Sequence, residues 1–190
     1  MYIFRRIMPI FMMALVFTGC AVQKKSLEDW DKNILVLAYS GSVQPPEETA
    51  ILVSLPFFVF PSGAFQPQDK TGAKYHHGYL NLSIVDGKPV SCLLSCNFRS
   101  TKRGIFGAYA TYTQILPGQH DLKFFYDDGM KHSTGNPALS VKLKAGDIFM
   151  IEPVLKDNKV APVLINLSNT NDAPIIRKII NQLLQEINND

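Results

Sequence analysis

Short apolar runs, separated by turn residues, fill the chain from residue 33 onward and restrict it to a β-rich fold. Two of them, NILVLAY at 33–39 and TAILVSL at 49–55, are continuous and rich in branched residues, as in buried strands. LNLSIV at 80–85 and ALSVKLK at 138–144 alternate instead, which is typical of a strand with one wet face. We therefore predict a mainly β, compact antiparallel sandwich-like domain over 33–190.

Turn dipeptides lie between the predicted strands. Asp86-Gly87 is a hairpin-turn pair, and Pro117-Gly118 would turn YATYTQIL into HDLKFFY as a hairpin corner with Gly118 at positive φ. His120 stands at the entrance of that second strand, so we expect it to bond to neighbouring backbone. The strand would place three aromatic or apolar side chains on one face: Leu122, Phe124 and Tyr126.

The segment 56–79 interrupts this pattern with three prolines and three glycines. Proline density predicts an irregular excursion and argues against a central strand. Long loops in compact domains often carry function, so we expect a ligand or partner surface here. Its candidate residues are Phe65, Tyr75, His76 and His77.

The C-terminal stretch predicts an amphipathic helix over 173–188. Its apolar residues recur at helical spacing, Asp172 precedes it, and Pro174 stands in its first turn. We expect the apolar stripe to dock onto the sheet, with a partner surface as the alternative.

The N-terminus predicts a secretory signal peptide over 1–19. Arg5 and Arg6 precede an apolar run at 7–17, and small residues lead to Cys20. That run of 11 residues is short of the roughly 20 that a spanning helix needs, although a retained transmembrane anchor is the alternative.

VFTGC at 16–20 resembles a bacterial lipobox, with Phe17 where the pattern prefers leucine. The resemblance implies that Cys20 is acylated and anchors the chain to a membrane, with 20–32 as lipidated N-terminus and tether. Ala21 follows, where aspartate would favour inner-membrane retention, so the resemblance implies the outer membrane, facing the periplasm. An ordinary signal peptide with an incidental cysteine is the alternative.

Composition narrows the partners and the redox chemistry. Without Arg5 and Arg6 the 19 basic residues fall to 17, against 16 acidic ones. No basic block resembles a nucleic-acid footprint, so we predict no nucleic-acid partner. An exported chain permits a disulfide between Cys92 and Cys96, which would need a turn between them; two small buried side chains are the alternative.

Motifs for catalysis are missing from the sequence. It has no nucleophile elbow, phosphate-binding loop or zinc-site spacing, so we predict no catalytic residues, no metal and no cofactor. A non-catalytic binding or structural module for an envelope partner is the main hypothesis. One alternative is a periplasmic metal or small-ligand binder that uses His76, His77, His120 and Asp127 or Asp128; another is a secretion-apparatus accessory lipoprotein.

Five signatures occur in order: the lipobox, YSGSVQPPEETAIL at 39–52, IVDGKPV at 84–90, ILPGQHDLKFFY at 115–126 and VKLKAGDIFMIEP at 141–153. Together they resemble small bacterial lipoproteins with a PEGA-like domain. The resemblance implies a compact antiparallel β-domain and supplies no catalytic residues. The proline-rich excursion and the C-terminal helix depart from that pattern.

Overall fold

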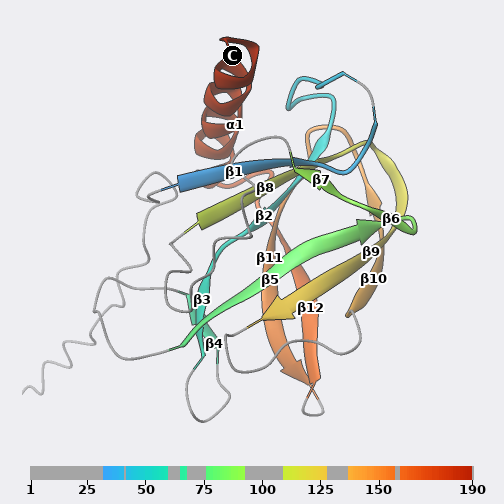
Figure 1. Ribbon diagram of the computed structural model, residues 1–190, viewed down its shortest axis with the longest axis vertical. Helices are drawn as coiled ribbons and strands as arrows, with labels where there is room; N and C mark the ends of the chain where they lie inside the picture. Colours follow the sequence, from blue (N-terminus) through green and yellow to red (C-terminus); the bar gives the residue numbers. More distant parts are fainter. Residues whose placement is uncertain are drawn as a thin grey trace, which may run out of the picture.

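The computed structural model describes residues 32–40, 42–59, 65–67, 76–92, 109–127, 137–156 and 159–189. Within them the chain is mainly β, with a single C-terminal helix (Figure 1). The elements are β1 Lys32–Leu37, β2 Ala50–Ser54, β3 Phe57–Val59, β4 Phe65–Pro67, β5 His76–Val85, β6 Lys88–Pro89, β7 Ser91–Cys92, β8 Tyr109–Ile115, β9 Gly118–Asp127, β10 Ala138–Leu143, β11 Ile148–Lys156, β12 Lys159–Asn166 and α1 Asp172–Asn189.

The strands form two sheets. The central sheet has the order β12-β11-β2-β8-β1-β7, and the second sheet has the order β10-β9-β5-β3-β4, with β6 paired to β5. All pairs of the second sheet are antiparallel. In the central sheet β1 and β8 pair in parallel, as do β2 and β11. The sequence pattern did not predict these two pairs, because they join strands that are distant in the chain.

Strand β2 shows how the layers are built. Ala50 and Leu52 belong to the core between the two sheets, whereas Ile51 and Val53 belong to the core between the central sheet and α1. Because successive side chains of a strand point to opposite faces, a strand covered on both sides must be apolar throughout. The continuous run at 49–55 therefore reflects a central layer with partners on both faces.

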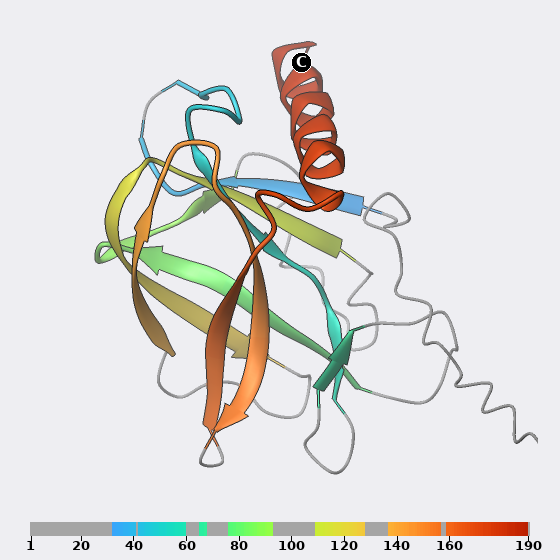
Figure 2. The ribbon, with the colours of Figure 1, turned by 180° about the vertical axis from the view of Figure 1, so that it is seen from behind.

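Helix α1 covers one face of the central sheet, as its apolar stripe predicted. Ile176 and Ile180 are fully buried in the core beneath it. Arg177 Nη2 also donates to the Gly146 carbonyl at 3.0 Å, which ties the helix to the turn between β10 and β11. Figure 2 shows α1 at one end of the molecule and the β11–β12 hairpin at the other.

The predicted irregular excursion at 56–79 is wrong in part. Its described residues form β3, β4 and the start of β5, and β3 lies inside the sheet between β4 and β5. The prolines are compatible with this because Pro56 precedes β3, and Pro67 closes β4 at the sheet edge, where a missing N–H is tolerated.

The predicted hairpin at Pro117-Gly118 is also wrong. Strand β8 belongs to the central sheet and β9 to the second sheet, so the turn carries the chain from one sheet to the other. Gly118 has the predicted positive φ, 152°. The predicted Asp86-Gly87 hairpin is confirmed, with φ of 50° and 78° between β5 and β6. The predicted face of β9 is confirmed as well, since its three members are all buried: Leu122, Phe124 and Tyr126.

Candidate functional site

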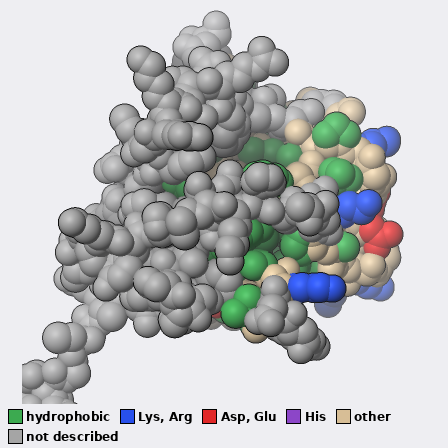
Figure 3. All heavy atoms as spheres, turned by 60° about the horizontal axis from the view of Figure 1, so that its bottom comes forward, with side chains coloured by type: hydrophobic (Ala, Val, Ile, Leu, Met, Phe, Trp, Pro, Cys, Tyr) green, Lys and Arg blue, Asp and Glu red, His purple; other side chains and the backbone are tan. Residues whose placement is uncertain are grey.

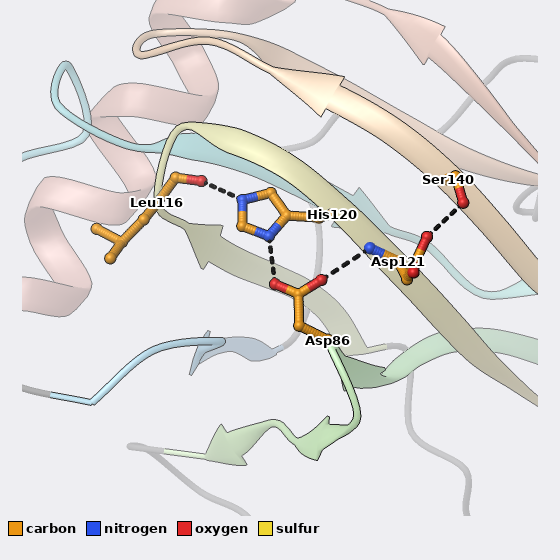
Figure 4. A network of polar contacts seen from close by, with 5 residues as sticks. All are labelled: Asp86, Leu116, His120, Asp121 and Ser140. Carbon is orange, nitrogen blue, oxygen red and sulfur yellow. Dashed lines mark hydrogen bonds and ion pairs between the residues drawn. The ribbon is translucent and has the colours of Figure 1, made fainter.

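A polar network joins the sheet-to-sheet turn to the β5–β6 hairpin (Figure 4). The His120 ring lies between the Leu116 carbonyl, 2.8 Å from Nε2, and the Asp86 carboxylate, 2.7 Å from Nδ1. The other Asp86 oxygen accepts the Asp121 backbone N–H at 2.8 Å. Ser140 on β10 donates its hydroxyl to the Asp121 side chain. The network therefore connects three strands of the second sheet.

Both ring nitrogens of His120 face oxygen acceptors, so neither is open to a metal or a substrate. The expected backbone contact of His120 is confirmed by its approach to Leu116. Asp86 has its pKa lowered, chiefly because its carboxylate accepts the Asp121 N–H and secondly because it pairs with His120. These contacts stabilise the ionised carboxylate, and they assign the network a bracing role at the end of the sandwich.

A cleft of about 440 Å³ lies between the β1–β2 connection and the C-terminal half of α1. Its walls are apolar for the most part and carry a few polar groups, which is the composition of small ligand or peptide sites. One stripe of the helix lines the cleft, at the spacing i, i+3 and i+6: Asn181, Leu184 and Ile187. The lining residues are Ser42, Val43, Gln44, Pro45, Pro46, Glu47, Asn181, Leu184 and Ile187.

Partly buried hydrogen bonds hold the loop wall of the cleft in place. Gln114, which is fully buried on β8, donates to the Gln44 carbonyl at 3.2 Å and accepts from the Tyr39 hydroxyl at 3.3 Å. The same hydroxyl accepts the Gln44 N–H at 3.1 Å. Burial raises the Tyr39 pKa, and the Gln44 N–H opposes that shift. The wall is therefore fixed to the central sheet and shaped before any ligand arrives.

The sequence-predicted surface residues come together only in part. Backbone pairing places Phe65 on β4 and His76 on β5 on either side of Val59, in one row across three strands. His77 stands in the adjoining row, opposite Phe58. The side chains of these residues lie outside the described part of the structure, as do Tyr75, Asp128 and the lipidation candidate Cys20. The surface stays a prediction.

The predicted disulfide falls at the border of the described chain. Cys92 ends β7 and its backbone pairs with Val36 of β1. The Cys92 side chain and Cys96 lie outside the described residues, so the bridge stays a prediction.

Sequence reasoning missed the cleft. Its two walls come from residues 42–47 and from α1, which are more than 130 positions apart in the chain. The available signal was that the apolar stripe of the helix continues to Ile187 while the loop opposite holds Val43 and a proline pair. A periodic pattern identifies such a stripe but does not say which loop faces it.

The helix-facing side of the central sheet holds incompletely bonded polar groups. Among the described residues, three buried side-chain atoms have no hydrogen-bond partner: Asn33 Oδ1, Thr49 Oγ1 and Tyr112 OH. Tyr112 belongs to the core under α1, and burial raises its pKa. Asn33 and Thr49 each precede, by two positions, a residue of that core, Leu35 and Ile51.

Comparison with protein-family models, with curated proteins and with solved structures gave no match for this chain. In the described ranges, no cluster of three or more His, Cys, Asp or Glu side chains could hold a metal ion. The same ranges contain no helix long and apolar enough to cross a membrane.

Proposed function

We propose that this chain is a lipid-anchored envelope protein whose β-domain is a non-catalytic binding module for an envelope partner. The cleft between 42–47 and α1 carries the proposal, because it is a concave feature of the described surface that combines apolar walls with polar groups. Its loop wall is pre-shaped by Gln114, which reduces the ordering that binding would require.

The polar chemistry of the domain supports binding over catalysis. General acid–base work requires a ring nitrogen or carboxylate free to reach a substrate. In the network around His120 both ring nitrogens and both Asp86 oxygens already have protein partners. The cleft itself holds one carboxylate side chain, Glu47, together with amides and a hydroxyl, which suit hydrogen-bonded recognition of a polypeptide.

The anchor rests on the lipobox-like VFTGC at 16–20. An acylated Cys20 would hold the domain at the membrane through a tether that ends at Lys32, the first residue of β1. The resemblance to PEGA-like lipoproteins, the outer-membrane address and the periplasmic exposure belong to the same proposal.

Site-specific photocrosslinking in cells tests the binding role. A photoreactive amino acid replaces Asn181, which lines the cleft, and in a matched variant it replaces Gln182, the exposed neighbour outside the cleft. We expect a defined envelope adduct at position 181 and none at 182. Equal labelling at both positions, or no adduct at 181, would contradict the cleft as the binding site.

Cell fractionation tests the anchor separately. Cys20→Ser should move the protein out of the membrane fraction while leaving its melting curve unchanged, because residue 20 precedes the first strand. Retention of the variant in the membrane fraction would refute lipid anchoring.

A further inference from the structure

The hairpin of β11 and β12 extends beyond the body of the central sheet. Pairing of β11 with β2 ends at Ile151 and Ser54, and Pro153, two residues later, lacks the N–H that would continue it. From there β11 pairs only with β12, as far as Lys156 and Lys159. The two strands therefore finish as a two-stranded ribbon at the end of the molecule away from α1 (Figures 1 and 2).

Exposed apolar side chains gather on this ribbon. Of the six large hydrophobic residues that are exposed in the described structure, three lie here, Val154 at 43%, Leu155 at 46% and Val163 at 41%, and Ile165 at 38% lies on β12 next to the ribbon. Figure 3 brings this end of the molecule forward and shows hydrophobic side chains beside lysine or arginine on the coloured surface. Clustering of this kind marks an interaction surface, whereas scattered apolar residues do not.

Strand register places most of these residues on one face. Directly paired residues share a face, and Met150 points into the core under α1, so its partner Ile165 lies on the same side. Alternation then adds the next rows toward the tip. In order the backbone pairs are Glu152 with Val163, Val154 with Ala161, and Lys156 with Lys159, where the Lys156 side chain lies outside the described structure. We call these three rows and Ile165 the ribbon face.

The charges of the ribbon face are self-complementary. Glu152 and the exposed Lys159 stand in the rows on either side of the apolar row of Val154 and Ala161. A two-fold axis that runs across the strands at that central row would turn the face over onto a second copy. Glu152 of each copy would then lie opposite the row of Lys159 in the other copy. In an isologous interface the same patch of both copies meets itself, so its opposite charges must face each other after the two-fold rotation. An anionic bilayer fits less well, because the acidic Glu152 lies on the same face as Lys159.

The open edge of β12 does not offer the same opportunity. The backbone N–H of Leu167 donates to the Ile148 carbonyl. The backbone N–H and C=O groups of the odd-numbered residues of β12 therefore bond to β11, and those of the even-numbered residues point away from the sheet edge. Pro162 thus stands in the middle of the outward edge and has no N–H to donate. Edge-to-edge pairing is disfavoured by such a proline, which leaves the face as the contact.

We propose that the ribbon face binds the ribbon face of a second copy of this chain, as a two-fold dimer with Val154 next to Val154 of the other copy. The bodies of the two copies then lie on opposite sides of the axis. We expect three paired rows and Ile165 to bury less than the roughly 800 Å² per partner of stable complexes, so the dimer would depend on a high local concentration of the chain. The proposal therefore rests on the lipid anchor, which concentrates the chain on a membrane.

Cysteine crosslinking of the lipidated protein in vesicles tests the dimer. Val154→Cys should give a larger fraction of disulfide-linked dimer than the parent protein. The crosslinking of the parent through Cys92 and Cys96 sets the baseline. Phe125→Cys, at a residue of similar exposure on the second sheet, is the control and should stay at that baseline. Equal crosslinking at the two positions would overturn the proposal.

Charge reversal gives a stricter test. In the Val154→Cys background, Glu152→Lys should lower the dimer fraction about tenfold through like-charge contact, as should Lys156→Glu with Lys159→Glu. An equal mixture of the two variants should restore the dimer, because each then faces opposite charge. An unchanged fraction in either variant, or a mixture that fails to recover, would contradict the two-fold arrangement.

Vesicle samples of the same variants distinguish a dimer from bilayer contact. Flotation of the vesicles shows separately whether the protein is anchored. If the protein does not float, it is crosslinked in concentrated solution instead. There, charge reversal must still lower the dimer fraction, and mixing the two variants must still restore it. The thiol of Val154→Cys is also labelled with a water-soluble maleimide. If vesicles protect this thiol from labelling and no dimer forms, the ribbon face contacts the bilayer and the proposal is overturned.

Discussion

The two faces of the central sheet differ in how fully their buried groups are bonded. Between the sheets, the buried hydroxyl of Ser54 donates to the Leu80 carbonyl at 2.6 Å, and Phe57 stacks on Tyr126 with ring centroids 6.1 Å apart. Under α1 the packing is equally apolar, yet Tyr112 OH is buried without a partner. Among the described residues, the Ser54 hydroxyl between the sheets is therefore hydrogen-bonded, whereas the Tyr112 hydroxyl under α1 is not.

This difference indicates a division of roles. The inter-sheet core, together with the His120 network at its end, forms a rigid frame. The helix layer is attached to the frame by an apolar stripe, and the cleft opens along its edge. Binding regions are drawn from the less stable parts of a fold, so we expect the helix layer to open more readily than the frame.

The largest effect should follow damage to the frame. Phe124 is fully buried between the sheets, whereas its neighbour Phe125 is 41% exposed on the outer face. Phe124→Ala should lower the free energy of unfolding by about 3–5 kcal/mol, because it removes a buried ring and leaves a cavity. Phe125→Ala should stay within about 0.5 kcal/mol of the wild type. Similar losses in urea melts of the two variants would show that the inter-sheet core is not the frame.

A smaller change is expected where Gly118 lets the chain pass between the sheets. Its φ is 152°, and a Cβ there would come within 3.3 Å of the His120 ring. Gly118→Val should therefore cost about 1–3 kcal/mol of backbone strain and disturb the network. Gly87→Ala is a useful comparison, because it has φ of 78° with open space around it and isolates the backbone cost. A wild-type melting curve for Gly118→Val would refute this role.

The charge on Asp86 should stabilise the frame in a pH-dependent way. Its pKa is lowered in the folded state, so the contribution is present above the ordinary aspartate pKa of 3.8 and is lost as pH falls through the lower folded value. Asp86→Asn keeps a residue that tolerates the positive φ of 50°. Because Asp86 is exposed, we expect a loss under about 1 kcal/mol at pH 7 that declines as the pH falls below 3.8. A loss independent of pH would contradict the ionic contact.

Two hydroxyl deletions should distinguish the two faces of the central sheet. Tyr112→Phe removes an unpartnered hydroxyl under α1 and should leave stability unchanged or raise it by about 1 kcal/mol. Ser54→Ala removes a bonded hydroxyl between the sheets and takes a buried donor from the Leu80 carbonyl, and it should cost about 1–3 kcal/mol. Equal losses in thermal melts of the two variants would remove the distinction between the faces.

The local sequence pattern was sufficient to predict single elements of the fold. The alternation at 138–144, the Asp86-Gly87 turn and the stripe of α1 were all predicted, because each depends on neighbours in the chain. The partner of each strand was not. Pro117-Gly118 has the same letters whether it closes a hairpin or crosses between sheets, and only the pairing of β8 with β1 and β2 decides.

The candidate site shows the same limit. His120 was predicted to meet nearby backbone, and its contact with Leu116, four residues away, follows from local sequence. Its contact with Asp86, 34 residues away, does not. Likewise, Tyr39 and Gln114 are 75 residues apart, and no motif indicates that they support one wall of a cleft.

Native-state hydrogen exchange tests the division between frame and helix layer most directly. The slowest amides of α1 and of β9 are followed in low concentrations of denaturant. We predict that the α1 amides exchange through an opening of lower free energy than the β9 amides, and that Tyr112→Phe narrows the gap. If both sets exchange only at the global unfolding free energy, the helix layer is no more separable than the frame, and the proposed division is contradicted.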